Sequence, residues 1–344
     1  MSKKQSAIDR FKSVSKSPAD PRELAQGVIS GDRGALSKAI TLVESSNKNT
    51  NDLAQNVIEH CLPHSGRSVR IGITGVPGVG KSTFIEAFGT YLTHQNKKVA
   101  VLTVDPSSNI SGGSILGDKT RMGKLSRNDS AFIRPSPSSG ALGGVANATR
   151  ESIILCEAAG YDLILVETVG VGQSEVGVYE MVDFFLLLAL AGAGDELQGI
   201  KRGIMEMADA VIINKADGAN LTKVNEAKRE YRNALHLFPP KTSGVEPKVL
   251  TCSSLHGENM SGIYSVIDNY VTKTRESGYF DRRRKEQAIT YMRESFKMLL
   301  DKMFQSNKVL KSKMHEYEAL VREGKITPFK ASQQLIDAFR SELR

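Results

Sequence analysis

The residues best suited to chemistry lie between positions 70 and 83, where an apolar stretch runs into a glycine-rich loop. The loop has the pattern Gly-x-x-x-x-Gly-Lys-Ser, and a helical pattern follows it. Glycine lets backbone N–H groups close around a phosphate, because a side chain there would block the approach or forbid the backbone angles. The pattern predicts a nucleoside triphosphate site in which Lys81 reaches the β- and γ-phosphates and Ser82 ligates Mg2+. The predicted binding residues of the loop are Gly75, Val76, Pro77, Gly78, Val79, Gly80, Lys81, Ser82 and Thr83.

A second motif, Asn214-Lys215-Ala216-Asp217, follows another apolar stretch and distinguishes guanine from adenine. The Asp217 carboxylate can accept both the N1–H and the exocyclic amine of guanine, whereas adenine has no donor at N1 and would leave the acid unpaired. A lost hydrogen bond of this kind costs about 1 to 3 kcal/mol, which favours GTP over ATP. The stretch 251–255 is a weaker signal for backbone contacts with the guanine O6. Its predicted binding residues are Ser253, Ser254 and Leu255.

A third motif consists of Glu167, at the end of an apolar stretch, and Gly170. Such an acid can hold Mg2+ directly or through water, and the glycine N–H can reach the γ-phosphate. In Ras-like GTPases the residue after this glycine is a glutamine that orients the attacking water, but here it is Val171. We therefore expect slow intrinsic hydrolysis that a partner or self-association accelerates. Asp105 and Asp118 are further candidates for the magnesium neighbourhood, although acids in loops are usually only solvated.

The apolar stretches that precede these motifs alternate with segments of helix length. The alternation predicts an α/β fold of the P-loop NTPase kind, with a mostly parallel sheet and helices on both faces. Ligands of such sheets bind at the carboxyl ends of the strands, where the motifs lie. The expected strands are 69–74, 98–104, 130–134, 162–167, 184–190, 210–214 and 248–252.

Two extensions are expected outside the P-loop GTPase domain, which is predicted at 67–278. Residues 1–20 are basic and serine-rich and are expected to be disordered, and 21–66 show the periodicity of a helical N-terminal extension. Residues 279–344 are expected to form a C-terminal helical dimerisation arm, although its apolar stripe could equally pack within the chain. The stripe consists of Ala288, Met292, Phe296, Leu299, Leu300 and Met303.

Composition argues against several other classes of protein. The chain of 344 residues is 40% hydrophobic and 24% charged, and its longest apolar run, 184–191, is far too short to cross a bilayer. Three isolated cysteines and six scattered histidines predict neither a disulfide framework nor a zinc site, and they fit a reducing cytoplasm. Most of the net charge of +8 lies after residue 280, without a nucleic-acid recognition module. We therefore expect no nucleic-acid and no membrane partner.

Together with the phosphate loop, five longer blocks resemble the methylmalonyl-CoA mutase-associated GTPase family, historically also labelled an arginine/ornithine transport ATPase. The resemblance runs from about residue 24 to residue 284, and several blocks are not shared by other GTPases. The blocks are VDPSS (104–108), ILGDKTRM (115–122), RPSPSSG (134–140), ETVGVGQSE (167–175) and GDELQGIK (194–201).

The resemblance implies a GTPase chaperone of an adenosylcobalamin-dependent acyl-CoA mutase, acting in cofactor delivery and in protection or reactivation of the mutase. It implies GTP with Mg2+, a homodimer formed through the C-terminal arm, and adenosylcobalamin only through the partner. The residues that it places around Mg2+ are Ser82, Asp105, Asp118 and Glu167. The segment 195–201 would be a mobile switch, in which Gln198 or Lys201 supplies the missing transition-state contact; a surface loop is the alternative. The expected catalytic residues are then Lys81, Glu167, Gly170, Gln198 and Lys201.

The sequence differs from the family pattern at two places, and three other functions are possible alternatives. Ser254 stands where many relatives have alanine, and the chain has no tryptophan, which the family often places near Tyr291. A metal-insertion GTPase is disfavoured because no His/Cys cluster is present. A transport ATPase or kinase for basic amino acids would need ATP, against the prediction from Asp217. A non-catalytic scaffold that uses the basic tail would not depend on Lys81.

Overall fold

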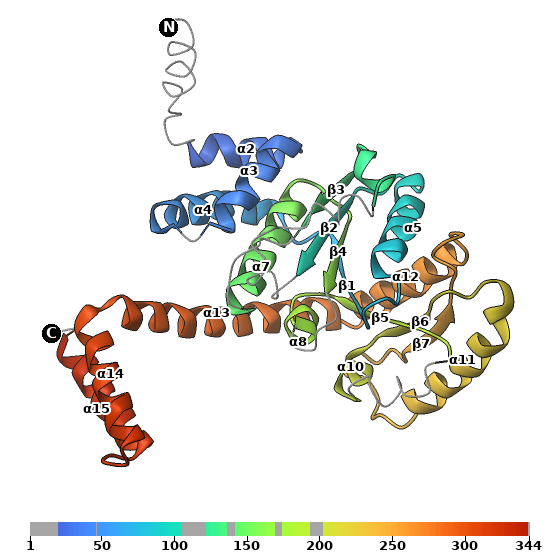
Figure 1. Cartoon of the computed structure of the whole chain (residues 1–344). Coiled ribbons are helices and arrows are strands. Elements are labelled where there is room, and N and C mark those ends of the chain that lie inside the picture. The colour runs from blue at the N-terminus through green and yellow to red at the C-terminus, as the bar shows by residue number, and fades with distance from the viewer. Residues whose placement is uncertain are drawn as a thin grey trace, which may run out of the picture. The chain divides into compact units, whose positions relative to one another are not determined.

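The computed structural model describes residues 20–45, 47–104, 122–135, 142–168, 174–192 and 202–342. Across these residues the chain forms a seven-stranded sheet in the order β3-β2-β4-β1-β5-β6-β7, with every neighbouring pair parallel (Figure 1). The strands are β1 (Val69–Gly75), β2 (Val99–Val104), β3 (Ala131–Arg134), β4 (Leu163–Thr168), β5 (Phe184–Ala189), β6 (Ala210–Ile213) and β7 (Lys248–Thr251). The α/β fold expected from the sequence is confirmed, and each strand begins and ends within one residue of its expected bounds.

The central strands are apolar because helices cover both faces of the sheet. All residues of β2, β4 and β5 are buried. Along β2, Val99 and Val101 pack into one hydrophobic cluster, whereas Ala100 and Leu102 pack into the cluster on the opposite face. The helices that cover the sheet are α5 (Lys81–His94) and α12 (Met260–Glu276) on one face, and α7 (Leu142–Ala158) and α8 (Ser174–Tyr179) on the other (Figure 1). Next to β6 lie α10 (Arg202–Met207) and α11 (Leu221–Leu235).

Parallel strands bring the predicted motifs to one edge of the sheet. The phosphate loop follows β1, Glu167 lies near the end of β4, Asn214 follows β6 and Ser253 follows β7. Because the carboxyl ends of parallel strands lie at the same edge, these loops face a common space.

The region before the sheet is helical and contributes to the core. Its elements are α2 (Pro21–Ile29), α3 (Arg33–Val43), α4 (Lys48–Cys61) and the 3-10 turn η1 (Leu62–His64). Asp32 caps α3, since its carboxylate accepts the N–H groups of Gly34 and Ala35 at 2.6 and 3.1 Å. Val28 and Ile40 are fully buried in the same cluster as α7, so these helices share a core with the sheet.

After α12 the chain continues with α13 (Tyr279–Ser306), α14 (Lys308–Arg322) and α15 (Pro328–Glu342). Residues 1–284 form one compact unit and residues 285–344 a second. Residues 323–327 separate α14 from α15, and a second break, at Asn307, separates α13 from α14; the sequence did not predict this break. There the Asn307 side chain accepts the N–H groups of Val309 and Leu310 at 2.9 and 3.2 Å and starts a new helix.

The apolar stripe predicted on α13 is exposed. Its five large side chains, Met292, Phe296, Leu299, Leu300 and Met303, are between 40% and 62% exposed. Within the second unit, the ring of Phe304 packs against Phe339 with 5.9 Å between centroids. Among the described residues, no helix is both long enough and apolar enough to cross a bilayer.

Candidate nucleotide site

The phosphate loop joins β1 to α5 and has two glycines whose place no other residue could take. Gly80 has a φ of +96°, and a Cβ atom there would lie 2.8 Å from Nδ2 of Asn214. A Cβ atom at Gly75 would lie 2.5 Å from the carbonyl oxygen of Leu188. A larger residue at either position would displace the loop. Because α5 begins at Lys81, its free N–H groups and the positive end of its dipole lie at the loop.

Lys81 is buried, and its ammonium group lies inside the loop. Its Nζ atom donates to the carbonyl oxygen of Gly75 at 2.7 Å and to that of Val76 at 3.3 Å. Burial lowers the pKa of the Lys81 ammonium, and the carboxylates of Glu167 and Glu175 oppose that shift. A phosphate group in the loop would supply the strong anionic acceptor that two backbone carbonyls replace only in part.

Ser82 and Glu167 form the described part of the predicted magnesium site. The Ser82 hydroxyl donates to Oε1 of Glu167 across 3.4 Å, from the first turn of α5 to the end of β4. A hydroxyl and a buried carboxylate are hard oxygen ligands of the kind that Mg2+ prefers, together with phosphate oxygens. Among the described residues, no group of three or more His, Cys, Asp or Glu side chains could hold a metal ion. By the chemistry of its donors, the pair of Ser82 and Glu167 fits a magnesium ion whose other ligands include phosphate oxygens of the nucleotide.

The Asn-Lys-x-Asp motif reaches the phosphate loop directly. Nδ2 of Asn214 donates to the carbonyl oxygen of Val79 at 2.9 Å, and Nζ of Lys215 donates to that of Gly78 at 3.1 Å. Asn214 and Val79 are 135 residues apart in the chain. The structure thus joins the two motifs from which the sequence predicted GTP.

The residues predicted to contact the base are Asp217 and those of the turn after β7, and the structure brings them together. The Ser253 hydroxyl donates to Oδ2 of Asp217 at 2.5 Å, which fixes the orientation of the half-buried carboxylate. Leu255 is 76% exposed, so its side chain does not enclose a base. Thr83, predicted in the loop, lies exposed in the first turn of α5.

Several predicted site residues lie outside the described residues. They are Asp105, Asp118, Gly170, Gln198 and Lys201. Their roles in metal binding, γ-phosphate contact and switching remain predictions.

The sequence assigned no role to Glu175, although it closes one of the family-like blocks. Glu175 lies in the first turn of α8, is 3% exposed and lies near enough to Lys81 to affect its pKa. Its burial and its effect on the Lys81 pKa make Glu175 a further candidate residue of the predicted site. The sequence could have identified Glu175 as a candidate site residue, because it comes just after the glycine-rich segment 169–173.

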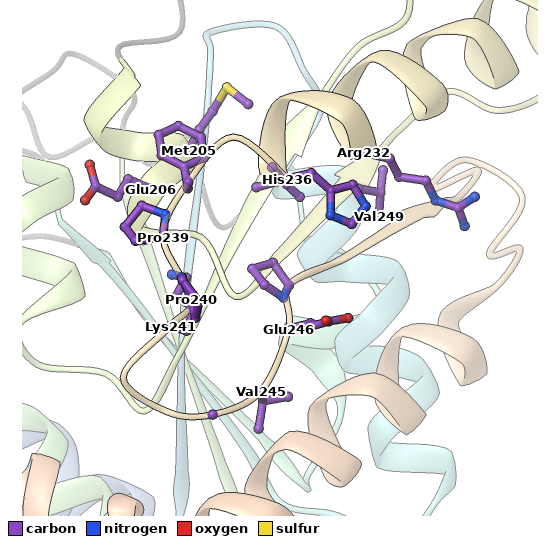
Figure 2. Close-up of a pocket in the computed structure, with 14 residues that line it drawn as sticks. Met205, Glu206, Arg232, His236, Pro239, Pro240, Lys241, Val245, Glu246 and Val249 are labelled. Carbon is purple, nitrogen blue, oxygen red and sulfur yellow. The ribbon is translucent and has the colours of Figure 1, made fainter.

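A separate cavity of about 500 Å³ lies between α10, the end of α11 and the loop that leads into β7 (Figure 2). Met205, Phe238, Lys241 and Val249 are among its lining residues. The cavity is lined by residues of α10, which precedes β6, and by residues of the loop that leads into β7, whereas the nucleotide motifs follow the carboxyl ends of these strands. It is therefore distinct from the nucleotide site.

Comparison with known proteins gives a GTPase family and GTPase relatives, as the phosphate loop and the Asn-Lys-x-Asp motif predict. Residues 36–309 match the family described as "Methylmalonyl Co-A mutase-associated GTPase MeaB". The chain is 50% identical over 264 residues to "GTPase ArgK" of Escherichia coli, covering 77% of this chain and 80% of that protein. It is 43% identical over 328 residues to "Methylmalonic aciduria type A homolog, mitochondrial" of Mus musculus, covering 92% and 79%.

Among solved structures, the crystal structure of an "LAO/AO transport system kinase" is similar, with a TM-score of 0.75 and 36% identity. The similarity covers 94% of this chain and 99% of that one. The family match, the named GTPase relatives and the phosphate loop joined to the Asn-Lys-x-Asp motif agree on one activity, the hydrolysis of GTP. The chain therefore belongs to the methylmalonyl-CoA mutase-associated GTPase family.

Proposed function

We propose that this GTPase is a chaperone of an adenosylcobalamin-dependent acyl-CoA mutase, either methylmalonyl-CoA mutase or a relative. In this role it gates delivery of the cofactor and protects or reactivates the mutase. The observation that carries the proposal is the match over residues 36–309 to a family named for its association with that mutase. The name of the mouse relative, a methylmalonic aciduria type A homolog, supports the same partner.

The proposed nucleotide is GTP with Mg2+, and the described side chains divide the binding between them. Lys81 would exchange its backbone carbonyl acceptors for the β- and γ-phosphates, and Ser82 with Glu167 would hold the metal ion. Asp217, oriented by Ser253, would accept the N1–H and the exocyclic amine of guanine. Bound Mg2+ neutralises charge that develops on the phosphate oxygens.

Hydrolysis by the isolated chain would be slow, because Val171 stands where Ras-like GTPases have the glutamine that orients water. We propose that docking of the mutase completes the site, with Gln198 or Lys201 supplying the missing contact. GTP would then be hydrolysed at an appreciable rate only after the partner has docked, and hydrolysis would set the time at which the cofactor is delivered. Adenosylcobalamin would meet this chain only through the mutase.

The chain is also proposed to form a homodimer through its C-terminal arm. The exposed stripe on α13 supports this, since large apolar side chains in a row are stabilised when a partner covers them. Replacing Phe296, which is 61% exposed, by serine should shift the sedimentation profile towards monomer. Replacing the exposed Lys297 by serine is the matched control and should leave the profile unchanged.

Two alternative functions receive less support. Insertion of a metal cargo would need soft or imidazole ligands, and the described residues contain no cluster of them. The similar solved structure is that of a transport system kinase by name, which would suggest ATP as the phosphate donor. The Asp217 carboxylate favours guanine instead, because it can accept the two donors that guanine presents at N1 and C2.

Co-purification tests the partner. The tagged chain, loaded with GDP or with a non-hydrolysable GTP analogue, should retain an adenosylcobalamin-dependent acyl-CoA mutase in at least one nucleotide state. A tagged Lys81→Ala variant, which should not hold nucleotide, is the control for nucleotide dependence. If the mutase is retained in neither state and is not protected from inactivation, the chaperone proposal is wrong and only the GTPase activity remains.

A further inference from the structure

Ser254 has a buried side chain that a backbone contact with guanine would not require. The sequence assigned its role to the backbone, because many relatives carry alanine there. In the structure its hydroxyl donates to Oδ1 of Asn214 at 2.7 Å, and its backbone N–H donates to the same oxygen at 3.1 Å. Ser254 is only 5% exposed, so water competes little for these bonds.

These bonds fix the direction of the Asn214 amide. Cys252 adds a third, weaker donor, with its Sγ atom 3.4 Å from Oδ1 of Asn214. With its oxygen held by three donors, the amide turns its nitrogen to the carbonyl oxygen of Val79. A reversed amide would place two oxygens against each other at Val79 and two donors against each other at Ser254, so it is disfavoured.

Asn214 in turn contacts the phosphate loop at the residues directly before α5. Its Nδ2 atom donates to Val79, and it lies so close to the next residue that a Cβ atom at Gly80 would be 2.8 Å away. The backbone at these two residues leads directly into Lys81, the first residue of α5. A change in the orientation of the Asn214 amide would therefore alter the backbone conformation of the phosphate loop at the predicted phosphate site.

We propose that Ser254 is a positioning residue for the phosphate loop, acting through the Asn214 amide. The two adjacent serines then have separate tasks, since Ser253 orients Asp217 on the base side and Ser254 fixes Asn214 on the phosphate side. This inference rests on the proposed nucleotide site. It requires neither the mutase nor the dimer.

The test measures dissociation of fluorescent N-methylanthraniloyl GDP and of the matching IDP, which lacks the exocyclic amine that Asp217 would accept. Ser254→Ala should release both nucleotides about fivefold faster, the effect of one lost hydrogen bond, and by the same factor because the base contact is unchanged. Ser253→Ala is the matched control. It should change the ratio of the GDP rate to the IDP rate, because it acts on Asp217.

A double-mutant cycle separates positioning from a general loss of structure. In an Asn214→Ala background, Ser254→Ala should have no further effect on dissociation, because the hydroxyl has lost its acceptor. Ser254→Cys keeps a donor at this position, but a weaker one, so its dissociation rates should fall between those of wild type and Ser254→Ala. This second variant tests the proposal even if the alanine variant folds poorly.

Three results would overturn the inference: unchanged dissociation in Ser254→Ala, a changed GDP to IDP ratio in that variant, or the full effect persisting without Asn214. Failure of the nucleotide site itself looks different. In that case the wild-type chain would not bind GDP, or Asp217→Asn would leave its base preference unchanged.

Discussion

The hydroxyl of Ser82 lies 3.4 Å from Oε1 of Glu167, although the two residues are 85 positions apart in the chain. One belongs to the helix that follows the phosphate loop and the other to the end of a buried strand. Their approach shows that the fold brings a hydroxyl and a carboxylate together beside the loop lysine. Binding of GTP with Mg2+ should therefore depend on Ser82 and Glu167, on Asp217, and on the contacts that stabilise the first compact unit.

Replacing Glu167 by glutamine should weaken the dependence of GTP binding on Mg2+. The amide keeps the shape of the side chain but loses the charge that a divalent ion requires. The Mg2+ concentration for half-maximal hydrolysis should rise at least about tenfold, whereas GDP binding in EDTA should change little. Glu230→Gln, on the exposed face of α11, is the control. An unchanged Mg2+ titration in Glu167→Gln would remove this residue from the metal site.

Replacing Asp217 by asparagine should change the base that the site prefers. Xanthine keeps the N1–H of guanine but carries an acceptor oxygen at C2 in place of the donor amine, so the asparagine amide can accept from N1 and donate to C2. We expect GTP binding to weaken by about one to two orders of magnitude and XTP binding to improve. Competition against a fluorescent GTP analogue measures both, with Asp268→Asn on the exposed face of α12 as control. Equal preference in variant and wild type would contradict the role of Asp217.

Replacing Arg284 by methionine should destabilise the first compact unit. The Arg284 guanidinium donates to both carboxylate oxygens of Asp183 at 2.7 and 2.6 Å, and also to the carbonyl oxygens of Gly66 and Ser68. Methionine would leave the buried Asp183 charge without its ion-pair partner, at a cost of about 3 to 5 kcal/mol in the free energy of unfolding. Urea denaturation measures this loss in the free energy of unfolding. Lys285→Met, next in the chain and exposed, should change it by less than about 0.5 kcal/mol.

Comparable urea midpoints for Arg284→Met and Lys285→Met would show that the Arg284 contacts contribute little to stability. The pKa of Arg284 is raised, because its bonds to Asp183 and the nearby Glu157 outweigh the effect of burial. The guanidinium is therefore charged throughout the accessible pH range. The difference between the two variants should shrink only in acid, where the carboxylates become protonated.

The three cysteines should resist alkylation in the folded protein. All three are free and buried, and burial raises the pKa of Cys61 to about 11 and that of Cys252 to about 12, from 9.0. The reactive thiolate is therefore scarce at pH 8, and iodoacetamide should modify these residues only after unfolding. The neutral thiols favour folding below pH 9.0, and this contribution is lost as the pH rises towards the folded values.

Peptide mass spectrometry after a timed pulse of iodoacetamide measures this protection. Because Cys252 contacts Asn214, bound GDP should slow its modification further, while the rate at Cys61 should fall only as much as global unfolding does. Rapid modification of Cys252 in the native protein, with or without GDP, would contradict the packing of the turn after β7.

The sequence predicted the sheet well, because strands β2, β4 and β5 are buried on both faces. Continuous apolar runs such as 184–189 are hard to mistake for exposed elements, and each ends in a motif that needs the strand to place it. The break at Asn307 was missed because the residues on either side both continue a helical pattern. Only the capping preference of asparagine marked the start of a new helix.

Side-chain contacts between distant turns were beyond the sequence. Nothing in the order of residues shows that the Ser254 hydroxyl turns to Asn214 or that Leu255 points outward, because both depend on the path of the chain after β7. The Asn-Lys-x-Asp motif could be recognised from the sequence because the same residues at the same spacing occur in other GTPases. The particular bonds that fix its geometry depend on tertiary packing.

The most direct test of the account is the single-turnover rate of GTP hydrolysis with and without a purified adenosylcobalamin-dependent acyl-CoA mutase in excess. We predict slow hydrolysis by the chain alone and a rate about tenfold higher or more with the mutase, because the partner would complete a site in which Val171 replaces the water-orienting glutamine of Ras-like GTPases. An equal rate in the two samples would contradict the proposal. So would hydrolysis by the dilute chain alone at about 5 to 20 per second, the rate of a fully activated small GTPase.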